Sequence, residues 1–267
     1  MWFFVLLVHV WAEDLSSVNK ARDLFLRDGR VAALSYLSRA IENPKIKPDQ
    51  KTKLISEGLN LSQRFLTDKA QRDFETAMST QYTSGASARG LYEKALAVEP
   101  DNLEILISLV LLELSEKKCS GAASRNKTIE TIWSQHPYFS YLQTLVKFCE
   151  KETVNLADLR ARAFPETLKP FAAILEIRIL VANGRGAEAI QLSRKLRETH
   201  PNYAEPLYWL YKAGQVETEG DIELLKKYVS TCDSYNEMAR REFRLDPTLC
   251  GNVTEATQVL KNEEVPK

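Results

Sequence analysis

Hydrophobic positions along the chain recur at intervals of three and four residues, and the strict alternation typical of strands is nearly absent. Such spacing predicts helices. In residues 18–44 the apolar positions share one helical face, a turn follows at Asp28-Gly29, and the same spacing resumes between Ala33 and Ile41. This segment therefore predicts a helical hairpin, two antiparallel helices joined by a tight turn.

Two further segments extend the helical pattern. Residues 54–82 repeat the alternation of apolar and polar faces. Residues 102–118 are apolar on almost every side, which in a soluble chain predicts a central helix covered by its neighbours. Because Glu104 and Glu113 lie inside this short run, it does not predict a membrane span. The chain as a whole predicts an all-α protein.

Four prolines mark the ends of amphipathic helices. A proline just past the last turn cannot continue a helix. Pro100, Pro137, Pro201 and Pro247 stand in this setting, at successive intervals of 37, 64 and 46 residues. The first interval is close to the length of one helical hairpin, so the prolines predict hairpins that repeat and stack.

One segment carries a specific spacing of small and aromatic residues. Ala88, Tyr92, Ala95 and Pro100 follow one another at steps of four, three and five. This resembles the second helix of a tetratricopeptide repeat. Two alanines would let a neighbouring helix approach, the tyrosine would fill the gap between them, and the proline would end the helix.

A weaker copy lies at residues 183–203, where Gly184 ends the first helix, Ala189 takes the small position and Pro201 the terminal one. In the helix before Pro100, the expected small residue falls on Thr76, one place from Ala77. The resemblance implies a right-handed superhelical array of roughly six helical hairpins, a tetratricopeptide-like solenoid, over residues 13–250. It also implies a concave groove lined by the first helix of each hairpin, which takes an extended peptide or a partner helix.

The two ends of the chain lie outside the predicted helical array. Residues 1–12 have the apolar stretch and the small residue at Ala12 that a secretory signal peptide requires, but its basic start is missing, since no Lys or Arg precedes Lys20. We expect a signal peptide truncated at its N-terminus, cut near Ala12. The alternatives are a first core helix, which would place the protein in the cytoplasm, and a peripheral membrane anchor. Residues 251–267 predict a partly disordered tail.

Charge and cysteines narrow the class of partner and the compartment. Lys+Arg and Asp+Glu both total 36, and this balance argues against nucleic acid, which needs a positive excess. Four cysteines, an even number, predict two disulfides in an oxidising compartment. Proximity favours Cys119 with Cys149 and Cys232 with Cys250. In a cytoplasmic protein the same residues would be buried thiols.

Two clusters are candidate partner-binding residues. A helix starting near Ala204 would place Glu205, Tyr208 and Lys212 on one face, which the repeat resemblance puts on the concave groove. The alternative is that these aromatics pack the C-terminal hairpins together. The second cluster is a basic patch of Arg240, Arg241 and Arg244, which would be either a solvated helix end or a dock for an acidic partner.

The sequence predicts no catalytic residue, metal site or cofactor, because it lacks the usual catalytic and phosphate-binding motifs. His136 and His200 each precede a helix-ending proline, where a histidine can bind terminal carbonyls. We therefore expect a non-catalytic protein-binding scaffold or adaptor in a bacterial cell envelope, periplasmic or secreted. The alternatives are a structural component of an envelope assembly that uses its edges and convex face, a cytoplasmic adaptor, and an enzyme on a helical scaffold.

Overall fold

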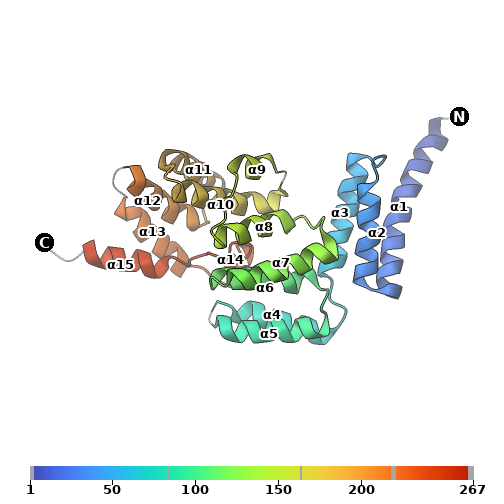
Figure 1. Cartoon of the computed structure of the whole chain (residues 1–267), viewed down its shortest axis with the longest axis horizontal. Coiled ribbons are helices and arrows are strands. Elements are labelled where there is room, and N and C mark those ends of the chain that lie inside the picture. The colour runs from blue at the N-terminus through green and yellow to red at the C-terminus, as the bar shows by residue number, and fades with distance from the viewer. Residues whose placement is uncertain (1–2, 83, 163, 218–220, 264–267) are drawn as a thin grey trace. The chain divides into compact units, whose positions relative to one another are not determined.

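The computed structural model describes residues 3–82, 84–162, 164–217 and 221–263. Within these ranges, the side chains of residues 3–15 and 216–217 are not described. These residues form helices joined by short loops, with no strand among them (Figure 1). The all-α prediction is confirmed. Neighbouring helices pack in pairs, which is compatible with a helical repeat, and the right-handed superhelix stays a prediction.

The chain divides into two compact units, Met1–Glu113 with Ser120–Gln143, and Leu114–Cys119 with Thr144–Lys267. The helices up to the boundary are α1 (Phe3–Asp28), α2 (Arg30–Glu42), α3 (Pro48–Gln63), α4 (Asp68–Thr80), α5 (Gly85–Val98), α6 (Leu103–Ser115), α7 (Cys119–Trp133) and α8 (Phe139–Cys149). The second unit continues with α9 (Leu156–Ala161), the 3₁₀ helix η1 (Glu166–Leu168), α10 (Lys169–Ala182), α11 (Gly186–Thr199), α12 (Glu205–Glu217), α13 (Ile222–Asp233), α14 (Glu237–Glu242) and α15 (Val253–Glu263).

The predicted turns lie where the sequence puts them. Gly29 separates α1 from α2 with φ 89°, and Gly184 separates α10 from α11 with φ 70°. Both angles belong to the left-handed region that glycine adopts at little cost. The helix from Phe3 runs without a break through the stretch predicted as a signal peptide. Residues 1–2 and the side chains of 3–12 lie outside those described, so cleavage near Ala12 stays a prediction.

The core of the α4–α5 hairpin uses the predicted small and aromatic residues. Ala88, Tyr92 and Ala95 are each fully buried in α5, and the ring of Tyr92 lies 5.6 Å from that of Phe74 in α4. In α4 Ala77 is fully buried, whereas Thr76 is exposed. The position one place from the expected one therefore makes the close helix contact.

The weaker copy packs in the same manner. Ala189 is fully buried in α11, and Ser193, which stands where the motif has an aromatic, is also fully buried. Both Pro100 and Pro201 lie just beyond the ends of α5 and α11. The predicted second helices and their ends are thus present.

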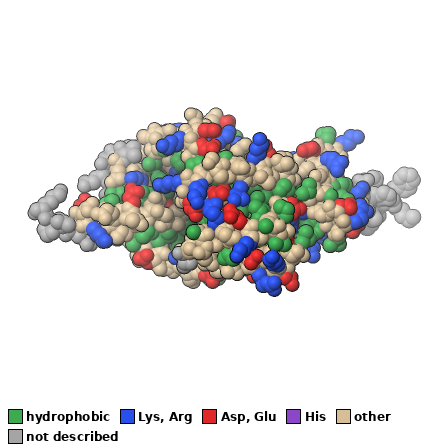
Figure 2. Space-filling model, turned by 60° about the horizontal axis from the view of Figure 1, so that its bottom comes forward, with side chains coloured by type: hydrophobic (Ala, Val, Ile, Leu, Met, Phe, Trp, Pro, Cys, Tyr) green, Lys and Arg blue, Asp and Glu red, His purple; other side chains and the backbone are tan. Residues whose placement is uncertain are grey.

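The surface mixes both signs of charge. Lys and Arg side chains lie among Asp and Glu on the face that Figure 2 shows, and hydrophobic side chains reach the surface between them. The most exposed large hydrophobic side chains are Leu26, Val31 and Leu66 in the first unit and Met238 in the second. No helix within the described part of the chain combines the length and the apolarity that crossing a bilayer takes.

Candidate partner-binding site

Helix α12 carries the candidate groove residues, and it begins at Glu205, one residue after the predicted start. Glu205 and Tyr208 are buried, with 0% and 3% of their surface exposed. Lys212 is about one third exposed and its Nζ lies 3.2 Å from Oε1 of Glu255 in α15. A partner cannot reach Glu205 or Tyr208 in this arrangement. Their burial fits the alternative expectation, that the aromatics of this segment pack the C-terminal hairpins together.

Glu205 sits at the centre of a buried polar network. Its Oε1 accepts hydrogen bonds from the hydroxyl of Tyr228, at 3.1 Å, and from the backbone N–H of Cys250, at 2.7 Å. Its other carboxyl oxygen is buried without a hydrogen-bond partner. Burial first, and the charge of Asp246 second, raise the pKa of Glu205 to about 8.

Asp246 is the second buried carboxyl of this network. Its Oδ2 accepts a hydrogen bond from the hydroxyl of Tyr203 at 2.5 Å, and its Oδ1 accepts from the backbone N–H and the hydroxyl of Thr248. The hydroxyl of Tyr235 donates to the carbonyl of Asn202 and accepts from the N–H of Ala204. The segment between α14 and α15 is therefore fixed by side-chain hydrogen bonds to the loop before α12, through Tyr203, and to α12 itself, through Glu205.

Helix α15 packs on α13, and its side chains also reach α12. Ala256 is fully buried, and with Tyr208, Tyr228 and other residues it belongs to one apolar cluster. Val253, Val259 and Leu260 pack against that cluster and are partly buried. The segment 251–267, predicted as a partly disordered tail, thus contains a helix that packs on the core of its unit.

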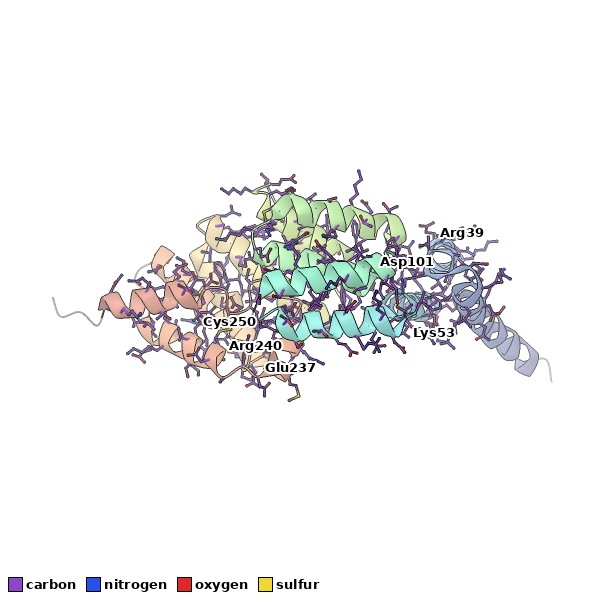
Figure 3. The ribbon with its side chains drawn as sticks, turned by 90° about the horizontal axis from the view of Figure 1, so that it is seen from below. Arg39, Lys53, Asp101, Glu237, Arg240 and Cys250 are labelled. Atoms are coloured by element: carbon purple, nitrogen blue, oxygen red, sulfur yellow. A yellow bond between two sulfur atoms is a disulfide. The ribbon has the colours of Figure 1, made fainter. Side chains whose placement is uncertain are left out.

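Two disulfides hold the second unit, and they are the pairs that proximity favoured. Cys119 and Cys149 are bonded, as are Cys232 and Cys250, and no cysteine is left free. The second bond joins α13 to Cys250, three residues before the start of α15 (Figure 3). Disulfides persist in oxidising compartments, so the pairing indicates such an environment.

The predicted basic patch lies on and after α14. Arg240 donates from Nε to the carbonyl of Tyr235 at 3.4 Å, and Arg241 pairs with Glu237 at 2.7 Å. Arg241 keeps 56% of its side-chain surface exposed, and Met238 is 76% exposed beside it. Arg244 follows the helix and is half-buried. The patch is therefore one of mixed apolar and basic character.

The two histidines do not converge with acids or nucleophiles. His136 is buried, and its Nδ1 accepts a hydrogen bond from the N–H of Tyr138 instead of donating to a helix-terminal carbonyl. Burial lowers the pKa of His136 to about 3, so it is neutral. His200 lies with Nδ1 2.9 Å from the hydroxyl oxygen of Thr199. Among the described residues no group of His, Cys, Asp and Glu is arranged to hold a metal ion.

A pocket of about 370 Å³ lies at the ends of α8 and α10. Its lining mixes polar and apolar side chains, among them Phe148, Lys151, Glu152 and Ile179. The charges of Lys151 and Glu152 oppose each other, so the pocket indicates no ligand class.

The sequence reasoning missed the residues that cover α12. Glu255 and the N–H of Cys250 contact the predicted face from segments far along the chain, and the charge of Asp246 acts on Glu205. One signal was available, because Val253, Ala256 and Leu260 stand at the i, i+3, i+7 spacing of an amphipathic helix. That spacing predicts α15 but does not identify the helix on which it packs.

Comparisons of the chain with protein-family models, with curated proteins and with solved structures found no match.

Proposed function

We propose that this protein is a non-catalytic scaffold that binds other proteins in an oxidising compartment outside the cytoplasm, with the periplasm of a bacterial envelope as the favoured place. The observation that carries the proposal is the patch on α14, where Met238 is 76% exposed beside Arg241, whose side chain is 56% exposed and pairs with Glu237 of the same helix. Contiguous exposed apolar surface rimmed by polar residues marks interaction sites, and we propose that Met238 contributes the apolar part of one.

The chemistry of this patch supports an acidic partner segment. An arginine guanidinium binds carboxylates through paired hydrogen bonds, and methionine adapts its shape to irregular apolar surfaces. Arg240 and Arg244, both half-buried, add two further basic residues on and just after α14. A peptide or helix with carboxylates around one apolar residue fits this surface best.

The cysteine chemistry supports the compartment. Both disulfides lie in the second unit and use every cysteine of the chain. A reducing cytoplasm would keep such thiols unpaired. The cytoplasmic adaptor is therefore the less favoured form of the same proposal.

In-cell crosslinking followed by affinity capture, on fractionated cells, tests both parts. We expect the protein in the exported fraction, and we expect the double variant Met238→Asp, Arg241→Glu to lose partners that the wild type captures. Arg194→Glu, at an exposed position of α11, is the matched control and should keep them. An identical set of captured proteins for all three chains would refute the patch as the binding surface.

A second candidate is a structural component of an assembly that uses its edges. Leu26 and Val31 are 75% and 45% exposed on either side of the Gly29 turn. Their exposure favours contacts at that end of the α1–α2 hairpin. Sedimentation velocity tests this candidate: Leu26→Asp should dissociate an assembly that Lys51→Asp, at an exposed position of α3, leaves intact. A monomer at all concentrations would count against it.

A further inference from the structure

Arg178 of α10 lies beside the pocket at the ends of α8 and α10. Its guanidinium carbon is 5.0 Å from the centre of the ring of Phe148, which lines the pocket. Arg178 is half-buried, and within the described ranges no hydrogen bond or ion pair joins it to another residue. A guanidinium has five N–H donors and binds carboxylates through paired hydrogen bonds. Arg178 therefore supplies an unpaired cation next to the wall of the pocket.

The pocket also has charges of both signs in its lining. Lys151 and Glu152 are exposed there, and neither forms an ion pair with another described residue. These two charges alone oppose each other, and Arg178 adds a second cation. The C-terminal ends of α8 and α10 add partial negative charge, because the negative end of a helix dipole lies there. A ligand with both a carboxylate and an ammonium matches this arrangement better than a plain anion or a plain cation.

The remaining wall is largely apolar and the pocket is small. Phe148, Val154, Ile179 and Ala182 contribute apolar surface, and Ile179 is buried. Pockets that bind small molecules have volumes of about 300 to 1,000 Å³. At about 370 Å³ this one is near the lower end of that range. It therefore favours a small ligand that carries one apolar group.

Both helix ends that form the pocket are held in place by the chain itself. The N–H of Glu152 donates to the carbonyl of Lys147 at 2.9 Å, and the disulfide of Cys149 fixes the end of α8. At the end of α10 the N–H of Asn183 donates to the carbonyl of Ile179 at 3.1 Å. A preformed site loses less conformational freedom when it binds, so a small ligand suffices to occupy it.

We propose that this pocket binds a free α-amino acid with an apolar side chain. The carboxylate of the ligand lies against Arg178 and Lys151, and its ammonium lies against Glu152 and the two helix ends. Its side chain packs on Val154 and Ile179. This binding goes beyond the partner-binding patch on α14 and does not rest on it.

Isothermal titration calorimetry of the full, oxidised chain tests the ligand class, with L-valine, L-leucine and L-phenylalanine as probes. At least one of them should bind with a stoichiometry of one. For L-leucine, 4-methylpentanoate lacks the ammonium and 3-methylbutylamine lacks the carboxylate, and the corresponding acid and amine serve the other two probes. Each analogue should bind at least about tenfold more weakly than its amino acid, because it loses charge-assisted hydrogen bonds. No binding of the three amino acids, or equal binding of either analogue, would overturn the proposal.

Charge variants test the named residues. Arg178→Gln and Glu152→Gln should each weaken binding at least about tenfold. Arg197→Gln is the matched control for the first, since Arg197 on α11 is also half-buried and without an ion pair to a described residue. Glu150→Gln is the control for the second, at an exposed position just after α8. Both controls should bind like the wild type, and equal losses in a variant and its control would contradict the assigned contacts.

Filling the pocket tests its location without removing a charge. Ala182→Phe, at an exposed position of the lining, should abolish binding, whereas Gln191→Phe, at an exposed position of α11, should leave it unchanged. Thermal melting of both chains separates lost binding from lost folding, since neither position is buried. Wild-type affinity in Ala182→Phe, or an equal loss in Gln191→Phe, would show that the ligand binds elsewhere and overturn the proposal.

Discussion

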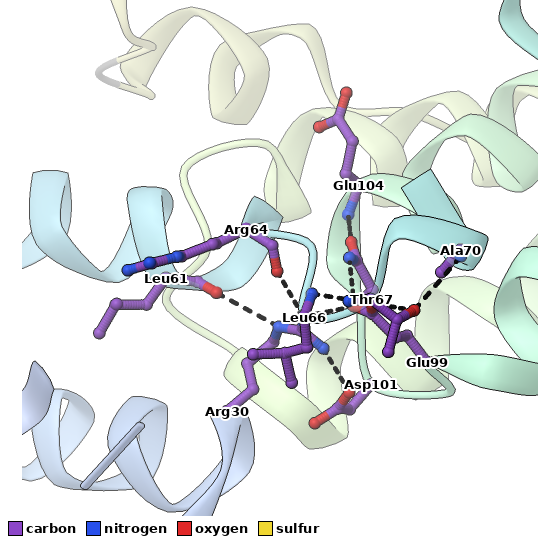
Figure 4. A network of polar contacts seen from close by, with 10 residues as sticks. Arg30, Leu61, Arg64, Leu66, Thr67, Ala70, Glu99, Asp101 and Glu104 are labelled. Carbon is purple, nitrogen blue, oxygen red and sulfur yellow. Dashed lines mark hydrogen bonds and ion pairs between the residues drawn. The ribbon is translucent and has the colours of Figure 1, made fainter. Parts of the chain in front are cut away.

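Arg30 at the start of α2 donates a hydrogen bond from Nη2 to Oε2 of Glu99, 2.9 Å away, and both side chains are buried (Figure 4). Arg30 also donates to the carbonyls of Leu61 and Arg64 and pairs with Asp101. Sixty-nine positions separate Arg30 from Glu99. One ion pair thus joins the hairpin α1–α2, the end of α3 and the loop after α5.

Glu99 also holds the start of α4. Its Oε1 accepts hydrogen bonds from the N–H groups of Leu66 and Thr67. Burial opposes its ionisation, but the hydrogen bonds from Asn102, from Arg30 and from these N–H groups outweigh it and lower the pKa of Glu99 below its ordinary value. The carboxylate is therefore charged and fully engaged at neutral pH.

Glu99→Ala should lower the free energy of unfolding by about 3 to 5 kcal/mol, because it leaves the charge of Arg30 buried with fewer partners. Glu93→Ala is the control, since Glu93 is half exposed and its pair with Arg125 should contribute less than about 1 kcal/mol. Urea unfolding followed by circular dichroism measures both. Equal losses for the two variants would show that the junction does not stabilise the first unit.

The glycines of two helices should respond to alanine in opposite directions. A Cβ on Gly58 in α3 would lie 2.5 Å from the indole of Trp133, so Gly58→Ala should destabilise by about 1 to 3 kcal/mol. A Cβ on Gly90 in α5 meets nothing within 4 Å, so Gly90→Ala should stabilise by about 0.5 to 1 kcal/mol. Thermal unfolding of both variants gives the sign directly. A stable Gly58→Ala chain would mean that Trp133 shifts without cost.

Local patterns in the sequence predicted the local features of this fold. The helical spacing, the turns at Gly29 and Gly184 and the pairing of near cysteines each depend on residues close in the chain, and each is present. Even such local predictions are limited in precision. The motif puts the small buried residue at Thr76, but Ala77 is the buried one, and a shift of one residue turns the side chain by about 100° around the helix.

The contacts that define the candidate site are of another kind. Glu205 accepts from Cys250, 45 residues away, and Arg30 binds Glu99 across 69. Periodicity predicts that Glu205 and Tyr208 share a face, and they do, but it does not predict that other segments of the chain bury that face. Burial of this kind depends on which helices meet, and a single sequence carries no local signal for it.

Acid should destabilise the first unit through His136. The ordinary pKa of histidine is 6.5, and burial lowers that of His136 to about 3. Between these values the unfolded chain binds a proton that the folded chain does not, so stability falls as the pH falls, by up to about 5 kcal/mol. His136→Asn keeps an acceptor for the N–H of Tyr138 but does not titrate, and should flatten this slope in urea unfolding from pH 7 to 3.5. A wild-type slope in His136→Asn would contradict the assignment.

Removing either disulfide should destabilise the second unit by about 3 to 4 kcal/mol, because each closes a loop that the unfolded chain would otherwise leave open. The sequence separations are 30 for Cys119–Cys149 and 18 for Cys232–Cys250, so the two losses should be similar. The double serine variants of each pair, compared with the reduced wild type by thermal melting, measure this. A melting temperature that reductant does not change would show that neither bond stabilises the fold.

The residues of α12 should separate packing from recognition. Tyr208 is 3% exposed, its ring lies 5.4 Å from that of Tyr228, and Tyr208→Ala should cost about 3 to 5 kcal/mol in the free energy of unfolding. Lys212→Ala removes one partly exposed pair and should cost less than about 1 kcal/mol. Only Lys212→Ala can therefore report on binding without unfolding the unit. A chain with this substitution that melts like the wild type but captures fewer partners would place recognition on α12, and unchanged capture would leave the patch around Met238 and Arg241 as the binding surface.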